Sequence, residues 1–297
     1  MKMIKAGIIG YNEGNGHPFS FAAITNGYVD SDALWGKYPQ ILNYLRSRDE
    51  TEFGVDGLSI THVWTQDLNI SREIAECSRI ENVLEDPMDF VGAVDFLIIA
   101  TDEGEKHRDI SSPFLEAGMM VFIDKPLCTN IEDLKYFLPY LQNGQLQSCS
   151  GFRFHPELEK HISVSQNREE AVLSVAYTKF DWFKYGIHLL EPILAFHQSE
   201  IVDFKKLSSG SDREVIQLTF SNGDTSILIR DPRTNAFRFD IHWKQGRGEI
   251  IFNDNFTYFK NLLIGLVSFY NGNPVYTWQE TQKAIELLIK IHQNESK

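Results

Sequence analysis

The stretch Ala117-Gly118-Met119-Met120-Val121-Phe122-Ile123-Asp124-Lys125-Pro126 reads as a helix end, a short buried strand and a polar exit from that strand. Its apolar run can be buried, whereas Lys125 can be buried only with a partner. Pro126 biases Lys125 toward an extended backbone. Ligands collect at the carboxyl ends of strands in open parallel sheets, so Lys125 lies where chemistry is expected. The alternative is a surface lysine at an ordinary strand exit.

Strands and helices alternate around this stretch throughout the first half of the chain. Their repeated βαβ order predicts a doubly wound parallel sheet with right-handed crossovers. Residues 28–57 interrupt the alternation and are expected to be an insertion. The expected strands are residues 4–10, 58–64, 94–100 and 121–123, and the expected helices are 19–26, 70–78 (capped by Asn69 or Ser71), 110–117 and 131–141.

The second half has a different pattern, in which hairpin signals at 221–224 and 245–248 join short strands. Strands are expected at 171–180, 214–220, 225–230, 237–243 and 249–252, with helices at 186–196, 258–270 and 277–293. This pattern predicts an α+β domain with a largely antiparallel sheet. A polar turn at 143–150 places the boundary between domains 1–149 and 150–297, and the final helix can pack on either one.

Bulk properties narrow the class of protein. The 297 residues allow about two domains. A net charge of −13 disfavours nucleic acid and anionic membranes as partners. No apolar stretch approaches the roughly 20 residues that span a bilayer. Three scattered cysteines, Cys77, Cys128 and Cys149, show no metal or redox spacing and are typical of the reducing cytoplasm. We therefore expect a cytoplasmic protein without a metal site.

A glycine-rich loop follows the first strand and contains Gly10, Tyr11, Asn12, Gly14 and Gly16. A strand, a glycine loop and a helix in this order form the geometry that binds a dinucleotide pyrophosphate. The spacing is wider than the standard G-x-G-x-x-G, and Glu13 adds a negative charge. An ordinary loop is thus the alternative to a cofactor site.

Two further strand ends carry polar residues. The second strand ends at Thr65, followed by Gln66 and Asp67, where a ribose-binding acid is usual in NAD sites. No arginine is placed there to hold a 2′-phosphate, so NAD and NADP both remain open. The third strand leads into a loop from Thr101 to His107, which is either a cofactor contact or a solvated acidic loop.

Ionisable residues also cluster in the second half. Lys184, His188 and Glu191 recur at i, i+4 and i+7, which places all three on one face of a helix. Histidine is the usual proton carrier near neutral pH, and neighbouring charges shift its titration. A satisfied core histidine is the alternative.

These segments, in this order, resemble the family of glucose–fructose oxidoreductase, inositol dehydrogenase and MocA-like proteins. Its Glu-Lys-Pro triplet is similar to Asp124-Lys125-Pro126, and its Asp-x-Gly-x-His-x-x-Asp helix is similar to residues 184–191. The resemblance covers residues 4–291. It implies an N-terminal Rossmann domain followed by a substrate-binding and oligomerisation domain with an open-faced sheet, assembled as a homodimer or homotetramer.

The resemblance also implies the site. The catalytic residues would be Lys125, His188 and Lys184. The residues that hold NAD or NADP would be Gly10, Tyr11, Asn12, Gly14, Gly16, Thr65, Thr101, His107 and Lys125. A sugar-like substrate would contact Lys125, Arg153, Tyr185 and His188. Lys184 replaces a family aspartate. Two lysines near His188 would suit an anionic substrate such as a uronate or nucleotide sugar, unless Lys184 points away.

The expected function is therefore an NAD(P)-dependent dehydrogenase that transfers a hydride between nicotinamide and a CH–OH group of a sugar-like molecule. Two alternatives remain open. One is an NAD-dependent glycoside hydrolase of the same family. The other is a non-catalytic ligand-binding protein on a decayed dehydrogenase scaffold, which the irregular glycine loop and Lys184 would explain.

Overall fold

A computed structural model describes residues 3–167, 171–197, 199–209, 212–235 and 237–293. The chain forms two compact units. The N-terminal unit comprises Met1–Cys149 and Asn255–Gln279, and the C-terminal unit comprises Ser150–Asp254 and Glu280–Lys297. The first unit thus takes in residues 255–279, which lie well beyond the predicted boundary.

The N-terminal unit is built on a six-stranded sheet in the order β3-β2-β1-β4-β5-β6, in which every pair is parallel. The four residues of β4 are all buried, because helices cover both faces of the sheet. The strands are β1 (Ile4–Ile9), β2 (Leu58–Trp64), β3 (Asn82–Val83), β4 (Phe96–Ile99), β5 (Met120–Ile123) and β6 (Leu146–Ser148). This architecture confirms the predicted doubly wound sheet.

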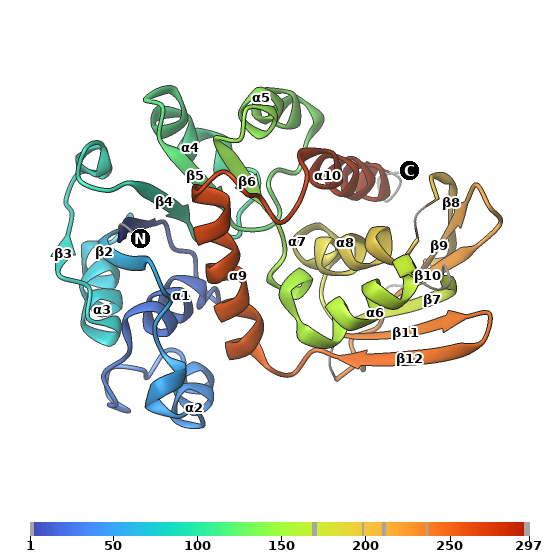
Figure 1. Ribbon diagram of the computed structural model, residues 1–297, viewed down its shortest axis with the longest axis horizontal. Helices are drawn as coiled ribbons and strands as arrows, with labels where there is room; N and C mark the ends of the chain where they lie inside the picture. Colours follow the sequence, from blue (N-terminus) through green and yellow to red (C-terminus); the bar gives the residue numbers. More distant parts are fainter. Residues whose placement is uncertain (1–2, 168–170, 198, 210–211, 236, 294–297) are drawn as a thin grey trace. The chain divides into compact units, whose positions relative to one another are not determined.

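The helices of this unit fall into two groups, which Figure 1 shows on opposite sides of the sheet. In one group α1 contacts both α3 and α9, and in the other α4 contacts α5. The helices are α1 (His17–Asn26), α2 (Pro39–Arg46), α3 (Leu68–Ser78), α4 (His107–Glu116), α5 (Ile131–Gln142) and α9 (Asn255–Tyr270), with short 3-10 turns at Glu50–Glu52 and Pro87–Phe90.

Three features of this unit differ from the expectation. The predicted turn at 143–150 contains β6, whose polar residues are buried because the strand pairs with β5. Helix α3 begins at Leu68, since Asp67 rather than Asn69 or Ser71 caps it. Helix α9, assigned to the second domain, packs on α1 through Phe259, whose ring lies 5.1 Å from that of Phe21. Aromatic packing explains why the chain returns to the first unit.

The C-terminal unit contains a six-stranded sheet in the order β12-β11-β7-β10-β9-β8. Neighbouring strands are antiparallel except β7 and β10, so the predicted largely antiparallel sheet is confirmed. The strands are β7 (Ala171–Thr178), β8 (Ile201–Ser209), β9 (Glu214–Phe220), β10 (Thr225–Arg230), β11 (Arg238–Trp243) and β12 (Gly246–Ile251). The edge strand β8 was not predicted, because its lysines and serines obscure the alternation of apolar residues.

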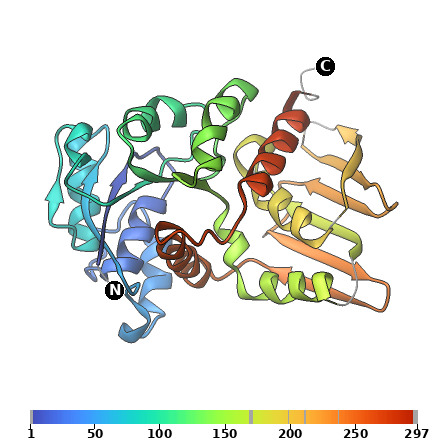
Figure 2. The ribbon, with the colours of Figure 1, turned by 45° about the horizontal axis from the view of Figure 1, so that its top comes forward.

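Helices α6 (Pro156–Asn167), α8 (Ile187–Phe196) and α10 (Trp278–Gln293) lie on one face of this sheet, as Figure 2 shows. A 3-10 turn, η3 (Gly151–Phe154), precedes α6, and a short helix, α7 (Trp182–Tyr185), precedes α8. The two helices α7 and α8 meet at Gly186, where a Cβ would lie 2.4 Å from the Trp182 carbonyl oxygen. Only glycine fits this junction. Within the described ranges, no helix is long and apolar enough to cross a membrane.

Candidate functional site

The glycine loop after β1 leaves space on its open side. Gly10 has a φ of +89°, and a Cβ there would meet the Thr101 side chain at 3.2 Å. Gly14 has a φ of +84°, with nothing within 4 Å of its Cβ position. Both positions favour glycine on backbone grounds. The open side at Gly14 and the start of α1 directly after Gly16 fit a bound dinucleotide pyrophosphate.

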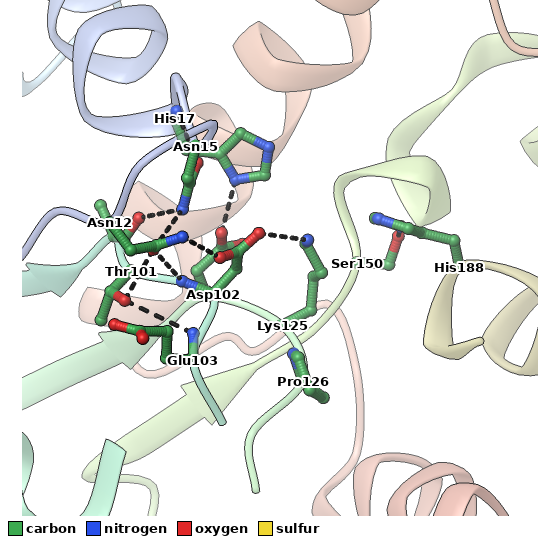
Figure 3. Close-up of polar contacts among 12 residues, drawn as sticks. Asn12, Asn15, His17, Thr101, Asp102, Glu103, Lys125, Pro126, Ser150 and His188 are labelled. Carbon is green, nitrogen blue, oxygen red and sulfur yellow. Dashed lines mark hydrogen bonds and ion pairs between the residues drawn. The ribbon is translucent and has the colours of Figure 1, made fainter. Parts of the chain in front are cut away.

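Asn12 joins this loop to the carboxyl end of β4. Its side-chain amide donates to Asp102 Oδ1 at 2.6 Å, and its Oδ1 accepts from Thr101 Oγ1 at 2.8 Å and from the Asp102 main-chain N–H at 3.1 Å. Asn15 Nδ2 donates to the Ala100 carbonyl at 2.8 Å. Figure 3 shows these side chains converging on the loop that follows β4. The structure thus brings together the predicted cofactor residues Asn12 and Thr101.

Lys125 lies at the carboxyl end of β5, as predicted, and is 2% exposed. Its Nζ lies 3.7 Å from Asp102 Oδ2 (Figure 3). The Lys125–Pro126 peptide bond is cis. The neighbouring carboxylate of Asp124 meets His17 Nδ1 at 2.5 Å. Charges of both signs therefore alternate along this edge, where sequence reasoning expected Lys125 alone.

The end of β2 is less open than expected. Thr65 is buried, and its Oγ1 contacts Ser71 Oγ at 2.9 Å and donates to the Asp67 carbonyl at 2.7 Å. Gln66 instead reaches the glycine loop, where its side chain bonds both the N–H and the carbonyl of Tyr11. The Thr65 hydroxyl is therefore engaged within the protein, and the predicted ribose contact through it is not supported.

His107 occupies a fully buried position at the start of α4. Its Nδ1 lies 3.0 Å from the Pro126 carbonyl and 3.1 Å from that of Leu127, and its Nε2 lies 2.9 Å from the Thr101 carbonyl. The imidazole thus ties the loop after β4 to the loop after β5. This geometry gives His107 a structural role in holding Thr101 and Lys125 in place, instead of the predicted direct contact with a cofactor.

The second polar cluster lies in the C-terminal unit and centres on His188. Ser150 Oγ lies 2.5 Å from His188 Nδ1 and accepts from the Phe152 N–H at 3.1 Å. The imidazole stacks on Phe152, with ring centroids 4.4 Å apart, and meets the edge of Phe237 at 5.3 Å. Ser150 keeps one hydrogen and one lone pair for Nδ1, so it can serve either tautomer of His188.

Glu191 lies one helical turn after His188 and also contacts Ser150, whose N–H donates to Glu191 Oε2 at 2.9 Å. Complete burial raises the pKa of Glu191 to about 8, against the lowering effects of the Arg153 charge and the Ser150 N–H. Arg153 bonds the Glu191 main-chain carbonyl at 2.9 Å and Glu280 Oε1 at 2.8 Å. These bonds give Arg153 a structural role, so the predicted substrate contact is not supported.

The remaining predicted residues flank this cluster. Tyr185 stacks on Phe180 at 4.3 Å, and its ring lies 5.9 Å from that of His188. Lys184 belongs to α7, and its Nζ lies 6.0 Å from the centroid of the Tyr185 ring. The helix is interrupted at Gly186, so the structure brings His188 and Glu191 together on Ser150, whereas Lys184 lies in the preceding helix.

Several residues of these clusters were not identified from the sequence: Asn15, His17, Asp102 and Ser150. Each lies next to a predicted residue, but its partner is distant in the chain, as with the 107 residues between His17 and Asp124. All three cysteines are buried. Burial raises the pKa of Cys77 and of Cys128 to about 12, which disfavours a thiolate nucleophile. Among the described residues, no cluster of three or more histidine, cysteine or acidic side chains could hold a metal ion.

Solved structures with the same fold cover almost the whole chain. Scyllo-inositol dehydrogenase from Lactobacillus casei gives a TM-score of 0.76 at 15% identity, covering 98% of this chain and 96% of its own. Myo-inositol 2-dehydrogenase from Lactobacillus plantarum gives a TM-score of 0.74 at 16% identity, covering 100% of this chain and 98% of its own. UDP-N-acetylglucosamine 3-dehydrogenase from Acidithiobacillus ferrooxidans gives a TM-score of 0.72 at 16% identity, covering 98% of this chain and 97% of its own. At this identity the likeness establishes the fold.

No curated protein matches the sequence significantly. Residues 36–150, in contrast, match the Gfo/Idh/MocA family model, which is described as "Oxidoreductase family, NAD-binding Rossmann fold". The predicted cofactor class and the predicted class of enzyme, a nicotinamide-dependent dehydrogenase, are confirmed with it. Residues 36–150, which make up most of the N-terminal unit, are thus similar to the NAD-binding Rossmann fold of the Gfo/Idh/MocA oxidoreductase family.

Proposed function

We propose that this protein is an NAD-dependent dehydrogenase that oxidises a secondary hydroxyl of a neutral, sugar-like polyol, or reduces the corresponding ketone. The observation that carries the proposal is the buried Lys125 ammonium at the carboxyl end of β5, in the same unit as the open glycine loop. The likeness in fold to two inositol dehydrogenases, one solved with NAD(H) and scyllo-inositol, supports the same class of substrate.

The reaction needs one hydride and one proton to leave the alcohol. Bound nicotinamide supplies the hydride acceptor. Lys125 donates a hydrogen bond to the substrate oxygen as it becomes a carbonyl, and Asp102 orients the ammonium. In the C-terminal unit, His188 is a second candidate proton carrier, whose Nδ1 lies 2.5 Å from Ser150 Oγ. These assignments give each of the two units one proton-handling residue.

Local charge favours a neutral substrate over the anionic one considered from the sequence. Lys125 already faces the Asp102 carboxylate, and Asp124 adds a second carboxylate that His17 contacts. A uronate would meet these carboxylates at close range, which costs electrostatic energy. We therefore infer that a cyclitol or an uncharged sugar is preferred to a uronate.

Charge also favours NAD over NADP. Lys37 pairs with Glu73 at 2.5 Å, and hydrogen bonding to Glu73 raises the Lys37 pKa, with Asp67 adding to the effect. Asp67, which follows β2, and Glu73 therefore bring two carboxylates to this region. A 2′-phosphate would be repelled there, whereas ribose hydroxyls would not.

Titration of the protein with NADH and with NADPH, followed by nicotinamide fluorescence, tests the proposal. We expect saturable NADH binding and a dissociation constant for NADPH at least about tenfold higher, equivalent to about 1.4 kcal/mol. Absence of binding to both would overturn the proposal and favour the non-catalytic alternative. Net NADH accumulation with a polyol would separate a dehydrogenase from a glycoside hydrolase that regenerates its cofactor.

The edges of the C-terminal sheet carry features that bear on assembly. Exposed apolar side chains occur on two edge strands of the C-terminal sheet, namely Val202 and Leu207 on β8 and Ile251 on β12. Such side chains are normally covered in oligomers. We therefore propose a homodimer or homotetramer. Sedimentation of a monomer at micromolar concentration would contradict it.

A further inference from the structure

The glycine loop departs from the usual fingerprint at two defined positions. The fingerprint places glycine at its first, third and sixth positions, of which the third lets the backbone approach the pyrophosphate. Counted from Gly10, the third position here is Asn12 and the sixth is Asn15. A side chain therefore replaces hydrogen at the place where loop and cofactor come closest.

The Asn12 side chain is directed into the protein, toward the loop after β4. Its amide donates to Asp102 Oδ1 at 2.6 Å, and its carbonyl oxygen accepts from Asp102 N–H at 3.1 Å, so Asn12 holds both the backbone and the carboxylate of Asp102. The second carboxylate oxygen, Oδ2, lies 3.7 Å from Lys125 Nζ. Figure 3 shows the three side chains in sequence, with Asp102 in the middle.

We propose that Asn12 is a positioning residue that links the cofactor loop to the Lys125 ammonium through Asp102. The inference rests on the proposed function, in which Lys125 contacts the substrate. The asparagine of the cofactor loop thus fixes the carboxylate that faces the lysine.

The geometry explains why the link matters. A separation of 3.7 Å is an ion pair but longer than a hydrogen bond, so rotation of the Asp102 carboxylate changes the field at the ammonium directly. The other charged groups at this edge are Asp124, next to Lys125, and His17 of α1, which contacts Asp124. Asp102 is a carboxylate that faces Lys125 Nζ within 4 Å.

Two variants break the link at different points. Asn12→Gly restores the usual fingerprint and releases Asp102, while Asp102→Asn keeps the shape and removes the charge. Glu103→Gln is the matched control, because Glu103 belongs to the same loop but pairs with Lys106 at the surface. Asn12→Ser provides a milder break if the glycine variant does not fold, and thermal melting shows which variants are native.

The first measurement is independent of activity. Cofactor-free protein is treated with acetic anhydride at a series of pH values, and acetylation of Lys125 is quantified by mass spectrometry. We expect Lys125 of Asp102→Asn to acetylate about tenfold faster than that of the wild type, since the ion pair with Asp102 no longer holds the amine in place. Asn12→Gly should fall between the two, and Glu103→Gln should match the wild type.

The second measurement compares kcat, KM and NADH affinity. Both link variants should lose about tenfold in kcat, with KM and NADH affinity within a few-fold of the wild type. Weaker NADH binding with unchanged kcat and unchanged acetylation would mean that Asn12 only braces the loop, which overturns the inference. If the wild type neither binds NADH nor turns over while acetylation shifts as expected, the proposed function fails and the Asn12–Asp102–Lys125 link stands.

Discussion

In the N-terminal unit, Lys125 keeps its ammonium beside the Asp102 carboxylate, whereas in the C-terminal unit His188 lies among aromatic rings with a serine hydroxyl at its Nδ1. The first cluster retains charge because opposite charges face each other at a sheet edge. The second cluster disfavours charge, because burial raises the pKa of Glu191 by more than the charge of the nearby Arg153 lowers it. The N-terminal unit therefore holds an ion pair, whereas the C-terminal unit holds a carboxyl group, Glu191, that changes protonation near neutral pH.

The largest effect is expected at the charged cluster. Lys125→Met preserves the length of the side chain but removes the hydrogen-bond donor to the substrate oxygen, and kcat should fall by about 10³-fold. NADH affinity should stay within a few-fold, as measured by fluorescence. Lys106→Met, which alters an exposed lysine paired with Glu103, is the control and should leave kcat unchanged. An equal loss in both variants would remove Lys125 from the proposed mechanism.

The next effect concerns stability in the neutral cluster. The folded-state pKa of Glu191, about 8, lies above its ordinary value of 4.5, so its burial stabilises the fold fully below about pH 4.5 and that contribution is lost as pH rises through about 8. Wild-type urea midpoints should therefore fall over this window by an amount worth roughly 5 kcal/mol.

Glu191→Gln should flatten this dependence, because glutamine carries no proton that the fold must retain. Glu200→Gln, an exposed carboxylate paired with Lys283, should keep the wild-type slope. Identical slopes in all three proteins would show that Glu191 ionises normally despite its burial.

His188→Gln tests whether the two clusters act on the same chemical step. We expect a loss of about 10²-fold in kcat, since a positioned acid–base group contributes about this much or more. In the double variant with Lys125→Met, the loss in activation free energy should be far smaller than the sum of the two single losses if both residues serve one proton transfer. Full additivity would mean that the clusters work independently.

Much of this contrast could be predicted from local sequence. The buried strand before Asp124, the glycine loop and the alternation of strands and helices follow from patterns within a few residues, so the N-terminal fold and the position of Lys125 were identified. The prediction missed β6 because Gln147 and Ser148 are polar in sequence but buried beside β5.

The partners of the predicted residues could not be obtained in the same way. Asp102 is 90 residues from Asn12, and Ser150 is 38 residues from His188. Such pairs form only when the order of the strands brings the loops together. No local sequence pattern indicates which oxygen of one loop will contact which nitrogen of another. For the same reason Arg153 was assigned to substrate, whereas the fold uses it between Glu191 and Glu280.

The smallest effect is expected for Ser150→Ala, which leaves His188 Nδ1 without its hydroxyl partner. We expect about a tenfold loss in kcat with little change in KM, and a shifted acid limb of the pH profile, because the bond to Ser150 orients the imidazole. Ser150→Thr should restore most of the activity, since it keeps the hydroxyl. A pH profile identical to that of the wild type would show that Ser150 only supports the backbone of η3.

The most direct test of the central claim is the accumulation of NADH when wild-type protein is given NAD⁺ and a neutral cyclitol, with the matching uronate and the Lys125→Met variant measured in parallel. The account predicts NADH formation with the cyclitol, slower formation with the uronate and almost none with Lys125→Met. Faster turnover of the uronate, or equal rates with and without the lysine, would contradict the assignment of Lys125 as the charge-balanced contact to a neutral polyol.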